Sequence, residues 1–270
     1  MDAEAEGSRT ARVSVAVMAH PSRREWAVNL SERLDCRVVW DRRNNVWDTA
    51  SRAWAAFDRQ ATHHAVIQDD AVVADHLREA LPGIVAWRPR SLISLLTIEV
   101  KLKPPDLARY RQTLADGGRW FWAHNGLPGC ALIMPVGDIP SMIAAGSGMS
   151  TPHDDQKIMS YFRSQRRFAW FTVPSLAQHR NQDENPSLVN PNRGWRPRQA
   201  GAFVGEDFDA RTLDFTPRDV PAEVEFDPVP PRAYRNKQTG RVVVAYDASQ
   251  QAQMARARRW VETGMPPLPS

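Results

Sequence analysis

The stretch HHAVIQDDAVV at residues 63–73 decides the fold. Residues 65–67 form a short, continuous apolar run, which predicts a strand that is buried on both faces. Two adjacent carboxylates, Asp69 and Asp70, follow this strand directly. In open α/β sheets ligands bind outside the carboxyl ends of the parallel strands. Acidic side chains at that edge can hold a divalent cation against a phosphate-bearing ligand.

The same acidic pair has a purely structural alternative. Two aspartates after a strand are also common in turns. Asp70 or Asp75 could cap a helix over residues 74–81 without any chemistry.

Two strand–helix units precede the acidic strand. Residues 12–19 alternate between polar and apolar side chains and then become continuously apolar. They include β-branched valines, and this pattern predicts a strand. A helix is expected over 22–34 and a second strand over 36–40, ending in Asp41, and together these have the size of a βαβ unit. An amphipathic helix over 45–60 then leads to the acidic strand.

The alternation of strands and helices continues after the acidic strand. Two prolines at 104–105 are expected to open a loop, and three adjacent aromatics at 120–122 cannot all face one core, so some of them are expected to be exposed. The remaining pattern predicts an α/β fold, with a helix at 75–80, a strand at 91–100, a strand at 129–134, a helix at 138–145, a helix at 154–163 and a strand at 168–173.

Composition limits the function classes. The chain has 270 residues and a formal net charge of +4, with acidic and basic residues interspersed. That charge suits anionic ligands but predicts no nucleic-acid surface. No apolar run approaches the roughly 20 residues of a membrane span, and the acidic start differs from a signal peptide, so we expect a cytoplasmic protein. Cys36 and Cys130 are expected to be buried thiols rather than a metal site.

The order of the motifs resembles the nucleotide-sugar-dependent glycosyltransferases of the GT-A fold, of a family 2-like or family 25-like bacterial or phage type. IQDD at 67–70 is followed by HDD at 153–155 and then by His179. The Asp-x-Asp signature of the family has Gln68 in its first place here. The resemblance covers about residues 12–205 and implies a GT-A (Rossmann-like), mixed and mostly parallel sheet flanked by helices, with a small C-terminal extension.

The resemblance also implies roles for individual residues. The donor would contact Ala19, His20, Arg23, Asp41, Arg52, Gln68 and Asp69. A divalent metal, Mn²⁺ or Mg²⁺, would bind Asp70, Asp69 and His179. The catalytic pair would be Asp154 and Asp155, with Asp155 as the general base and Asp154 as a helix cap. Arg52 and His179 each keep a structural alternative, as a solvated arginine and as a satisfied histidine, although imidazole is a suitable metal ligand.

The leading hypothesis is a metal-dependent, hexosyltransferase-like glycosyltransferase. It would move a sugar from a nucleotide-diphosphate donor, with a UDP-sugar as the first choice, to an acceptor hydroxyl with inversion. The acceptor is open: a protein such as a phage virion component is one candidate, which would place the enzyme in the host cytoplasm. Paired carboxylates equally serve a metal-dependent nucleotidyltransferase or phosphohydrolase. A non-enzymatic binding module is the third alternative.

The distribution of proline suggests four segments. Residues 1–10 are expected to form a disordered leader and 11–205 the catalytic domain, within which a long loop over 181–201 is a candidate lid. A proline-rich linker is expected over 206–231. Residues 232–270 are expected to form a hairpin followed by a helix.

Overall fold

The computed structural model describes residues 11–123, 125–180, 198–216, 232–235 and 242–245. The leader expected at 1–10, most of the candidate lid, most of the linker and the C-terminal helix expected at 248–263 lie outside these residues.

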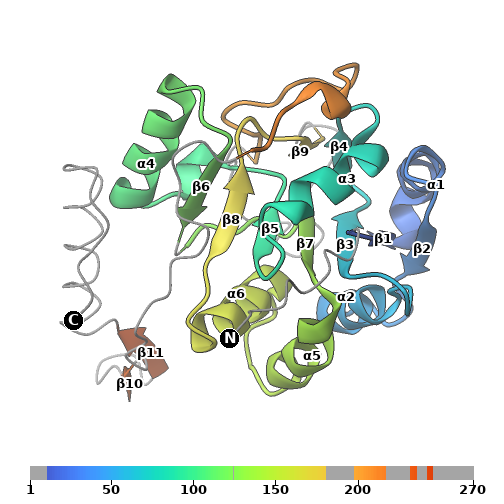
Figure 1. The fold of residues 1–270 in the computed structure, drawn as a ribbon. Coiled ribbons are helices and arrows are strands. Elements are labelled where there is room, and N and C mark those ends of the chain that lie inside the picture. The colour runs from blue at the N-terminus through green and yellow to red at the C-terminus, as the bar shows by residue number, and fades with distance from the viewer. Residues whose placement is uncertain (1–10, 124, 181–197, 217–231, 236–241, 246–270) are drawn as a thin grey trace, which may run out of the picture.

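A seven-stranded mixed sheet forms the centre of the protein (Figure 1). Five of its strands run in one direction, while β7 and β6 run in the other. This confirms the predicted α/β class with a mostly parallel sheet. The strand order is β2 (Arg37–Trp40), β1 (Val13–Ala19), β3 (His63–Gln68), β7 (Ala131–Pro135), β5 (Leu92–Ser94), β8 (Ala169–Thr172) and β6 (Trp120–Ala123).

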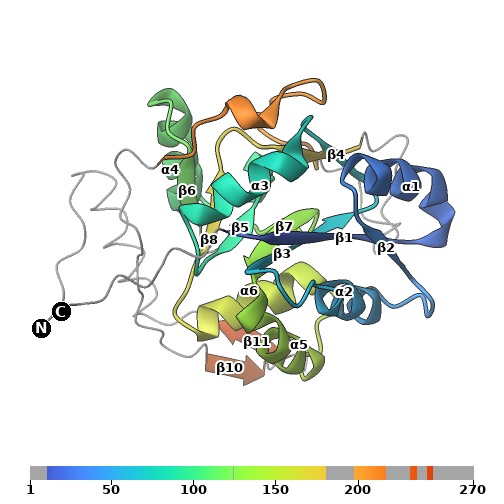
Figure 2. The same cartoon turned by 45° about the vertical axis from the view of Figure 1, so that its right-hand side comes forward.

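Helices cover both faces of this sheet (Figure 2). Apolar residues of α1 (Arg24–Arg33) and α3 (Leu77–Ala86) pack on one face, where they form one hydrophobic core. Those of α2 (Val46–Ala55), α5 (Ile139–Ser147) and α6 (Asp154–Ser164) pack on the other face and form a second core. The apolar run in β3 is therefore buried on both sides, as its composition predicts.

Two predicted elements differ from the structure. The strand expected over 91–100 ends at Ser94: the N–H of Leu95 still donates to Ala131 of β7, but the carbonyl of Leu95 accepts hydrogen bonds from Leu176 and Ala177, outside the main sheet. The loop expected after residues 104–105 is wrong, since Pro104 begins the helix α4 (Pro104–Ala115). Proline is compatible with the first turn of a helix, where its missing N–H would have no intrahelical partner.

The expectation that some aromatics at 120–122 are exposed is also wrong. Trp120, Phe121 and Trp122 are 2%, 1% and 1% exposed. They form strand β6, in which successive side chains point to opposite faces. The two tryptophans enter one core and Phe121 enters the other, so a single core does not have to hold all three.

A small second sheet joins β4 (Ala71–Val73) to β9 (Ala177–His179) as an antiparallel pair. The two strands lie side by side at the top of Figure 1. In their register Ala71 is opposite His179. This pairing places β9 next to the acidic end of β3, although the two segments are more than a hundred residues apart in the sequence.

The described residues beyond 198 include a segment that packs on the main body and a hairpin. Within the stretch expected to be linker, Ala210, in η4 (Ala210–Thr212), lies in the core beside α3, and Phe215 lies in the same core against Trp120. β10 (Arg232–Arg235) pairs antiparallel with β11 (Val242–Ala245), as a hairpin requires. The remaining short 3-10 turns are η1 (Pro21–Arg23), η2 (Glu99–Lys101) and η3 (Val136–Asp138). Within the described part of the chain no helix has the length and apolar character needed to cross a membrane.

Candidate functional site

The carboxyl ends of three neighbouring strands meet at one edge of the sheet. β1 lies between β2 and β3 and is parallel to both. Beyond the ends of these strands the backbone N–H of Asp41 donates to the carbonyl of Ala19 at 2.6 Å, and that of Asp69 donates to Met18 at 3.0 Å. The structure therefore brings together the residues that sequence reasoning placed after separate strands, which are Ala19, His20, Asp41, Gln68 and Asp69.

Asp69 is held by the loop that follows β1. Its Oδ2 accepts a hydrogen bond from the backbone N–H of His20 at 2.7 Å. Its Oδ1 accepts a hydrogen bond from Nη1 of Arg23 at 3.0 Å. Burial raises the pKa of the Asp69 carboxyl; the two hydrogen bonds oppose that rise, and the charge of Asp70 adds to it. The His20 side chain caps η1 by accepting the N–H of Ser22.

Asp70 lies between basic side chains and a histidine. Its Oδ2 is 3.3 Å from Nη1 of Arg23 and 3.7 Å from Nη1 of Arg198. Its Oδ1 is 3.3 Å from Nδ1 of His179. Arg23 thus bridges both carboxylates of the acidic pair, and Asp70 is 3% exposed. At the start of α3 the N-cap residue His76 is in the left-handed conformation and makes no capping hydrogen bond with its side chain, while Asp75 Oδ1 accepts a hydrogen bond from the backbone N–H of His76 at 3.0 Å.

His179 reaches Asp70 because β9 pairs with β4. The backbone N–H of Arg180 donates to the carbonyl of Asp70 at 2.8 Å, which fixes this register. Nδ1 of His179 is buried and makes no hydrogen bond within the described residues. Two ligand atoms of one metal ion are themselves roughly 3.0–3.5 Å apart at metal distances of about 2.1 Å. The facing oxygen and nitrogen atoms of Asp70 and His179 therefore fit a divalent cation.

Cys130 lies beside this pair. Ligand atoms of Cys130, Asp70 and His179 all lie within 4.8 Å of one another, and all three residues are buried. The backbone N–H of Gln68 donates to the carbonyl of Cys130 at 2.7 Å, which fixes the cysteine next to the end of β3. Burial raises the pKa of the Cys130 thiol well above its ordinary value.

Asp154 begins α6 and faces the same edge. Its Oδ2 accepts a hydrogen bond from Nε2 of Gln68 at 3.4 Å. Burial raises the pKa of Asp154 to about 7, and the neighbouring charge of Asp155 contributes to the rise. Gly129 passes close by: a Cβ placed on it would lie 3.1 Å from Nε2 of Gln68 and 3.4 Å from Oδ1 of Asp154. Gln68 therefore connects the acidic edge of the sheet to the first carboxylate of α6.

Asp155 occupies a different environment from Asp154. Its Oδ1 accepts the backbone N–H of Gln156 at 2.7 Å, and its Oδ2 is 4.0 Å from Nζ of Lys101. The side chain is partly exposed. The two adjacent carboxylates therefore differ in environment. Asp154 is buried, whereas Asp155 is hydrogen-bonded to the N-terminus of the helix and faces Lys101.

Arg52 and Asp41 lie at the end of β2. Arg52 forms an ion pair with Asp48 at 3.0 Å and donates to the carbonyl of Trp40 at 3.0 Å, so its contacts join α2 to β2. Although burial acts to raise the pKa of Asp41, N–H groups of Arg43 and Asn45 bind its carboxylate and hold the pKa below its ordinary value. Asp41 therefore stays ionised close to the end of β1.

Three residues of this site escaped sequence reasoning. Cys130 precedes a buried strand and looks like an ordinary core thiol. Arg198 follows a long proline-rich and asparagine-rich stretch, and Arg180 follows β9, where its guanidinium lies 5.1 Å from the ring centre of Trp26. The one signal in the sequence was the abundance of arginine after residue 179, which does not by itself indicate where those side chains lie.

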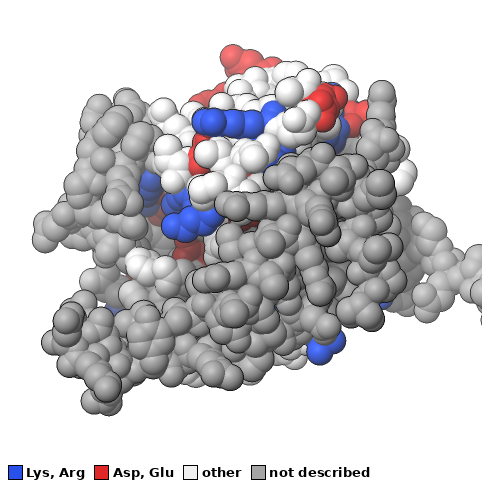
Figure 3. Space-filling model, turned by 90° about the vertical axis from the view of Figure 1, so that its left-hand side faces the viewer, with Lys and Arg blue, Asp and Glu red and all other residues white. Residues whose placement is uncertain are grey.

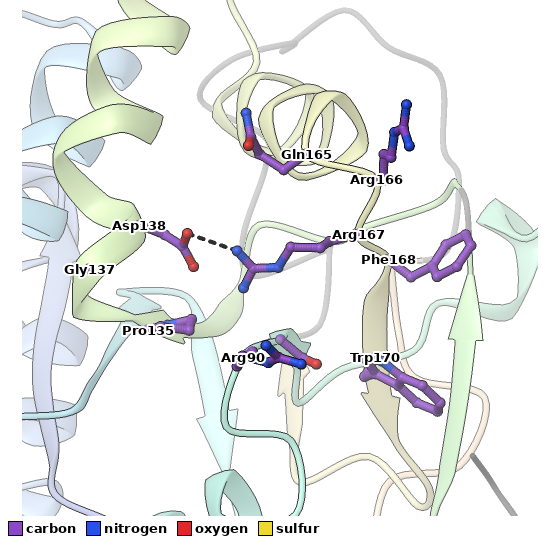
Figure 4. Close-up of a pocket in the computed structure, with 10 residues that line it drawn as sticks. Arg90, Pro135, Gly137, Asp138, Gln165, Arg166, Arg167, Phe168 and Trp170 are labelled. Atoms are coloured by element: carbon purple, nitrogen blue, oxygen red, sulfur yellow. Dashed lines mark hydrogen bonds and ion pairs between the residues drawn. The ribbon is translucent and has the colours of Figure 1, made fainter. Parts of the chain in front are cut away.

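A cavity of about 460 Å³ lies at the opposite end of the sheet, away from the acidic edge. It is lined by residues just before β5, at and after the end of β7, and before and at the start of β8. Figure 4 shows Arg167 pointing toward Asp138, with which it forms a 2.8 Å ion pair, while Phe168 and Trp170 form one wall. None of the candidate site residues lines this cavity.

Charge on the described surface is mixed. On the face turned to the viewer in Figure 3, described Lys and Arg side chains lie next to Asp and Glu side chains. The arrangement agrees with the interspersed charges of the sequence.

Comparisons with known proteins gave structural matches only. No protein-family description matches the sequence, and no curated protein matches it. Among solved structures, the chain is similar to a mutant of Drosophila β-1,4-galactosyltransferase 7 in complex with manganese, UDP-Gal and xylobiose. The identity is 11% and the TM-score 0.39, over 89% of this chain and 98% of the other. The catalytic domain of the same Drosophila enzyme with xylobiose matches over the same shares, at 10% identity and a TM-score of 0.35. These TM-scores are too low to establish a shared fold or activity.

Proposed function

We propose that this protein is a metal-dependent glycosyltransferase of the GT-A type. It would transfer a sugar from a nucleotide-diphosphate donor, with a UDP-sugar as the first choice, to an acceptor hydroxyl with inversion. One observation carries the proposal: a facing Asp70–His179 pair, a buried Asp154 and the guanidinium of Arg23 all gather at the carboxyl ends of β1 and β3. Ligands of open α/β sheets bind at such ends.

The donor would lie along the ends of β2, β1 and β3. In this proposal the base and ribose lie near Ala19, His20 and Asp41, with Asp69 fixing the loop through His20 and Arg23. Arg23 and Arg198 supply positive charge beside Asp70, where a diphosphate would need it. Arg52 plays a supporting role, because its hydrogen bonds hold the end of β2 against α2.

Asp70 and His179 would hold the divalent ion, Mn²⁺ or Mg²⁺ in the GT-A pattern. A bound divalent ion neutralises the charge that develops on the departing nucleotide diphosphate. Asp70 would supply Oδ1 and His179 would supply Nδ1, because Oδ2 of Asp70 faces Arg23 at 3.3 Å. Asp69 contributes by orienting Arg23, since both of its oxygens already accept hydrogen bonds.

Asp154 is the general base in this proposal. Its ionised carboxylate takes the proton of the acceptor hydroxyl as the acceptor oxygen forms its bond to the anomeric carbon. The bond from that carbon to the diphosphate oxygen breaks at the same time, and the nucleotide leaves with the electron pair. A base with a pKa near the working pH is the most effective, which favours Asp154, with its pKa of about 7, over the more exposed Asp155 assigned from the sequence. Gln68 orients the Asp154 carboxylate through its amide.

The test measures donor binding and donor breakdown. A thermal-shift screen of nucleoside diphosphates is run with Mn²⁺ and without it, because a bound ligand raises stability by RT ln(1 + [L]/Kd). Nucleotide-sugars are then incubated with the protein, and the released nucleotide is identified. We expect metal-dependent binding and release of a nucleoside diphosphate, both lost in Asp70→Asn and retained in Asp116→Asn, which alters a surface carboxylate bound by Gln112.

Other products would indicate the alternatives. Release of phosphate or pyrophosphate would identify a phosphohydrolase or a nucleotidyltransferase. An absence of metal-dependent nucleotide binding would favour a non-enzymatic binding module.

A further inference from the structure

Cys130 joins Asp70 and His179 in a buried cluster that the expected carboxylate–histidine metal site does not include. Its Sγ, a carboxylate oxygen of Asp70 and a ring nitrogen of His179 lie within 4.8 Å of one another. The three side chains come from the residue before β7, the turn after β3 and the end of β9. Backbone hydrogen bonds from Gln68 to Cys130 and from Arg180 to Asp70 fix all three segments at this point.

Two properties distinguish the cluster from an ordinary core thiol. The His179 side chain is 6% exposed, and its Nδ1 points at the cluster without a hydrogen bond among the described residues. The adjacent oxygen belongs to a carboxylate, so nitrogen, oxygen and sulfur donors converge on one space. Cys36 offers the contrast: it is the other cysteine of the chain, is only partly buried, and belongs to no such cluster of described residues.

We propose that Cys130 is the third protein ligand of the metal site, and that the site therefore takes a thiophilic divalent ion such as Zn²⁺ in preference to Mg²⁺. This inference deepens the proposed function, since it concerns the same site. Ligands of one tetrahedral Zn²⁺ are roughly 3.3–3.7 Å apart. Asp70 and His179 already have this spacing at 3.3 Å, and Cys130 lies within 4.8 Å of both.

The chemistry of the ligand set determines this preference. Imidazole and thiolate together suit Zn²⁺, whereas Mg²⁺ prefers oxygen ligands. On binding, the S–H bond of Cys130 breaks, the electron pair remains on Sγ to form the bond to the ion, and the proton passes to the buffer. The positive charges of Arg23 and Arg198 lie on the Oδ2 side of Asp70 and leave Oδ1 facing the cluster.

Cobalt provides the direct test on the full chain. The protein is stripped of metal under reducing conditions and titrated with Co²⁺ while the absorption spectrum is recorded. We expect a sulfur-to-cobalt charge-transfer band in the near ultraviolet that Zn²⁺ abolishes by competition. The band should be absent in Cys130→Ser and unchanged in Cys36→Ser, the matched control. In Cys130→Ser the affinity for Zn²⁺ should fall at least tenfold, and the affinity for Mn²⁺ should fall by less.

A second measurement keeps the test valid if Cys130→Ser does not fold. X-ray absorption of the wild-type protein loaded with Zn²⁺ should show a sulfur neighbour at about 2.3 Å. Co²⁺ or Zn²⁺ binding without a sulfur signature would overturn the role of Cys130 and leave the proposed glycosyltransferase standing. A failure of the wild-type protein to bind any divalent ion would overturn both. A sulfur signature without nucleotide-sugar turnover would support the metal site and refute the proposed function.

Discussion

Nδ1 of His179, at the end of β9, lies 3.3 Å from Oδ1 of Asp70, in the turn between β3 and β4, although more than a hundred residues separate them. Nδ1 of His179 is buried from water, and it makes no hydrogen bond to any of the residues that the structure describes. Polar atoms buried in this way are uncommon, and the approach of the two atoms is the basis of the metal site proposed above.

The first prediction follows from this pair. His179→Ala removes one ligand, so the metal concentration for half-maximal nucleotide binding should rise at least tenfold, by analogy with the losses that follow changes around metal sites. Isothermal titration with Mn²⁺ and with Zn²⁺ measures this. The control is His76→Asn, which changes a partly exposed histidine whose positive φ asparagine tolerates. An unchanged titration in His179→Ala would make this histidine a structural residue.

The second prediction separates the two carboxylates at the start of α6. Asp154→Asn should lower the transfer rate by about 10²–10⁴, because a general base contributes that much, while donor and metal binding persist. Asp155→Asn should change the rate much less, since its carboxylate binds the helix N-terminus. Single-turnover rates across pH measure both. In the wild type the rate should rise with pH through about 7, where Asp154 loses its proton. The opposite ranking of the two variants would return the base to Asp155.

The third prediction concerns stability and pH. Because burial raises the pKa of Asp154 from 3.8 to about 7, the folded protein holds this proton over a range in which the unfolded chain has lost it. The folded state then binds more protons, so this carboxyl's contribution to stability is complete below about pH 4 and falls as pH rises toward 7. Asp154→Asn should flatten the melting temperature across that range, and the surface control Asp116→Asn should not. A variant with the wild-type slope would show that Asp154 is ionised in the fold.

The fourth prediction concerns the close approach of Gly129 to the site. In Gly129→Ala the new methyl group would press on Nε2 of Gln68 at 3.1 Å and on Asp154, so the amide must move. We expect a lower transfer rate, by up to about tenfold, since displacements of about 1 Å can cost 10²-fold and the shift here is smaller. Gly137→Ala is the matched control, because nothing lies within 4 Å of its added Cβ. Equal rates in the two variants would show that the Gln68–Asp154 contact does not matter to the reaction.

The errors of sequence reasoning have physical causes in particular elements. The helix α4 was not predicted because two adjacent prolines usually indicate a loop. In the structure Pro104 occupies the first helical position, where proline is tolerated. The aromatics of β6 were expected to be partly exposed because a sequence window does not show that this strand has a core on each side. β5 ends early because the carbonyl of Leu95, the residue that follows it, bonds to the backbone at the start of β9.

The sequence by itself determined the first half of the sheet and the residues at its edge. Apolar runs and helical periodicity act over a few neighbouring residues, so β1, β2 and β3 could be located, and Ala19, Asp41 and Asp69 follow at their ends. Only the tertiary structure decided which distant residues join them. His179 meets Asp70 through the pairing of β4 with β9, Asp154 becomes buried against Gln68, and Cys130 comes close to Asp70 and His179. Strand pairing and burial depend on contacts between segments far apart in the chain, and local pattern does not specify which segments meet.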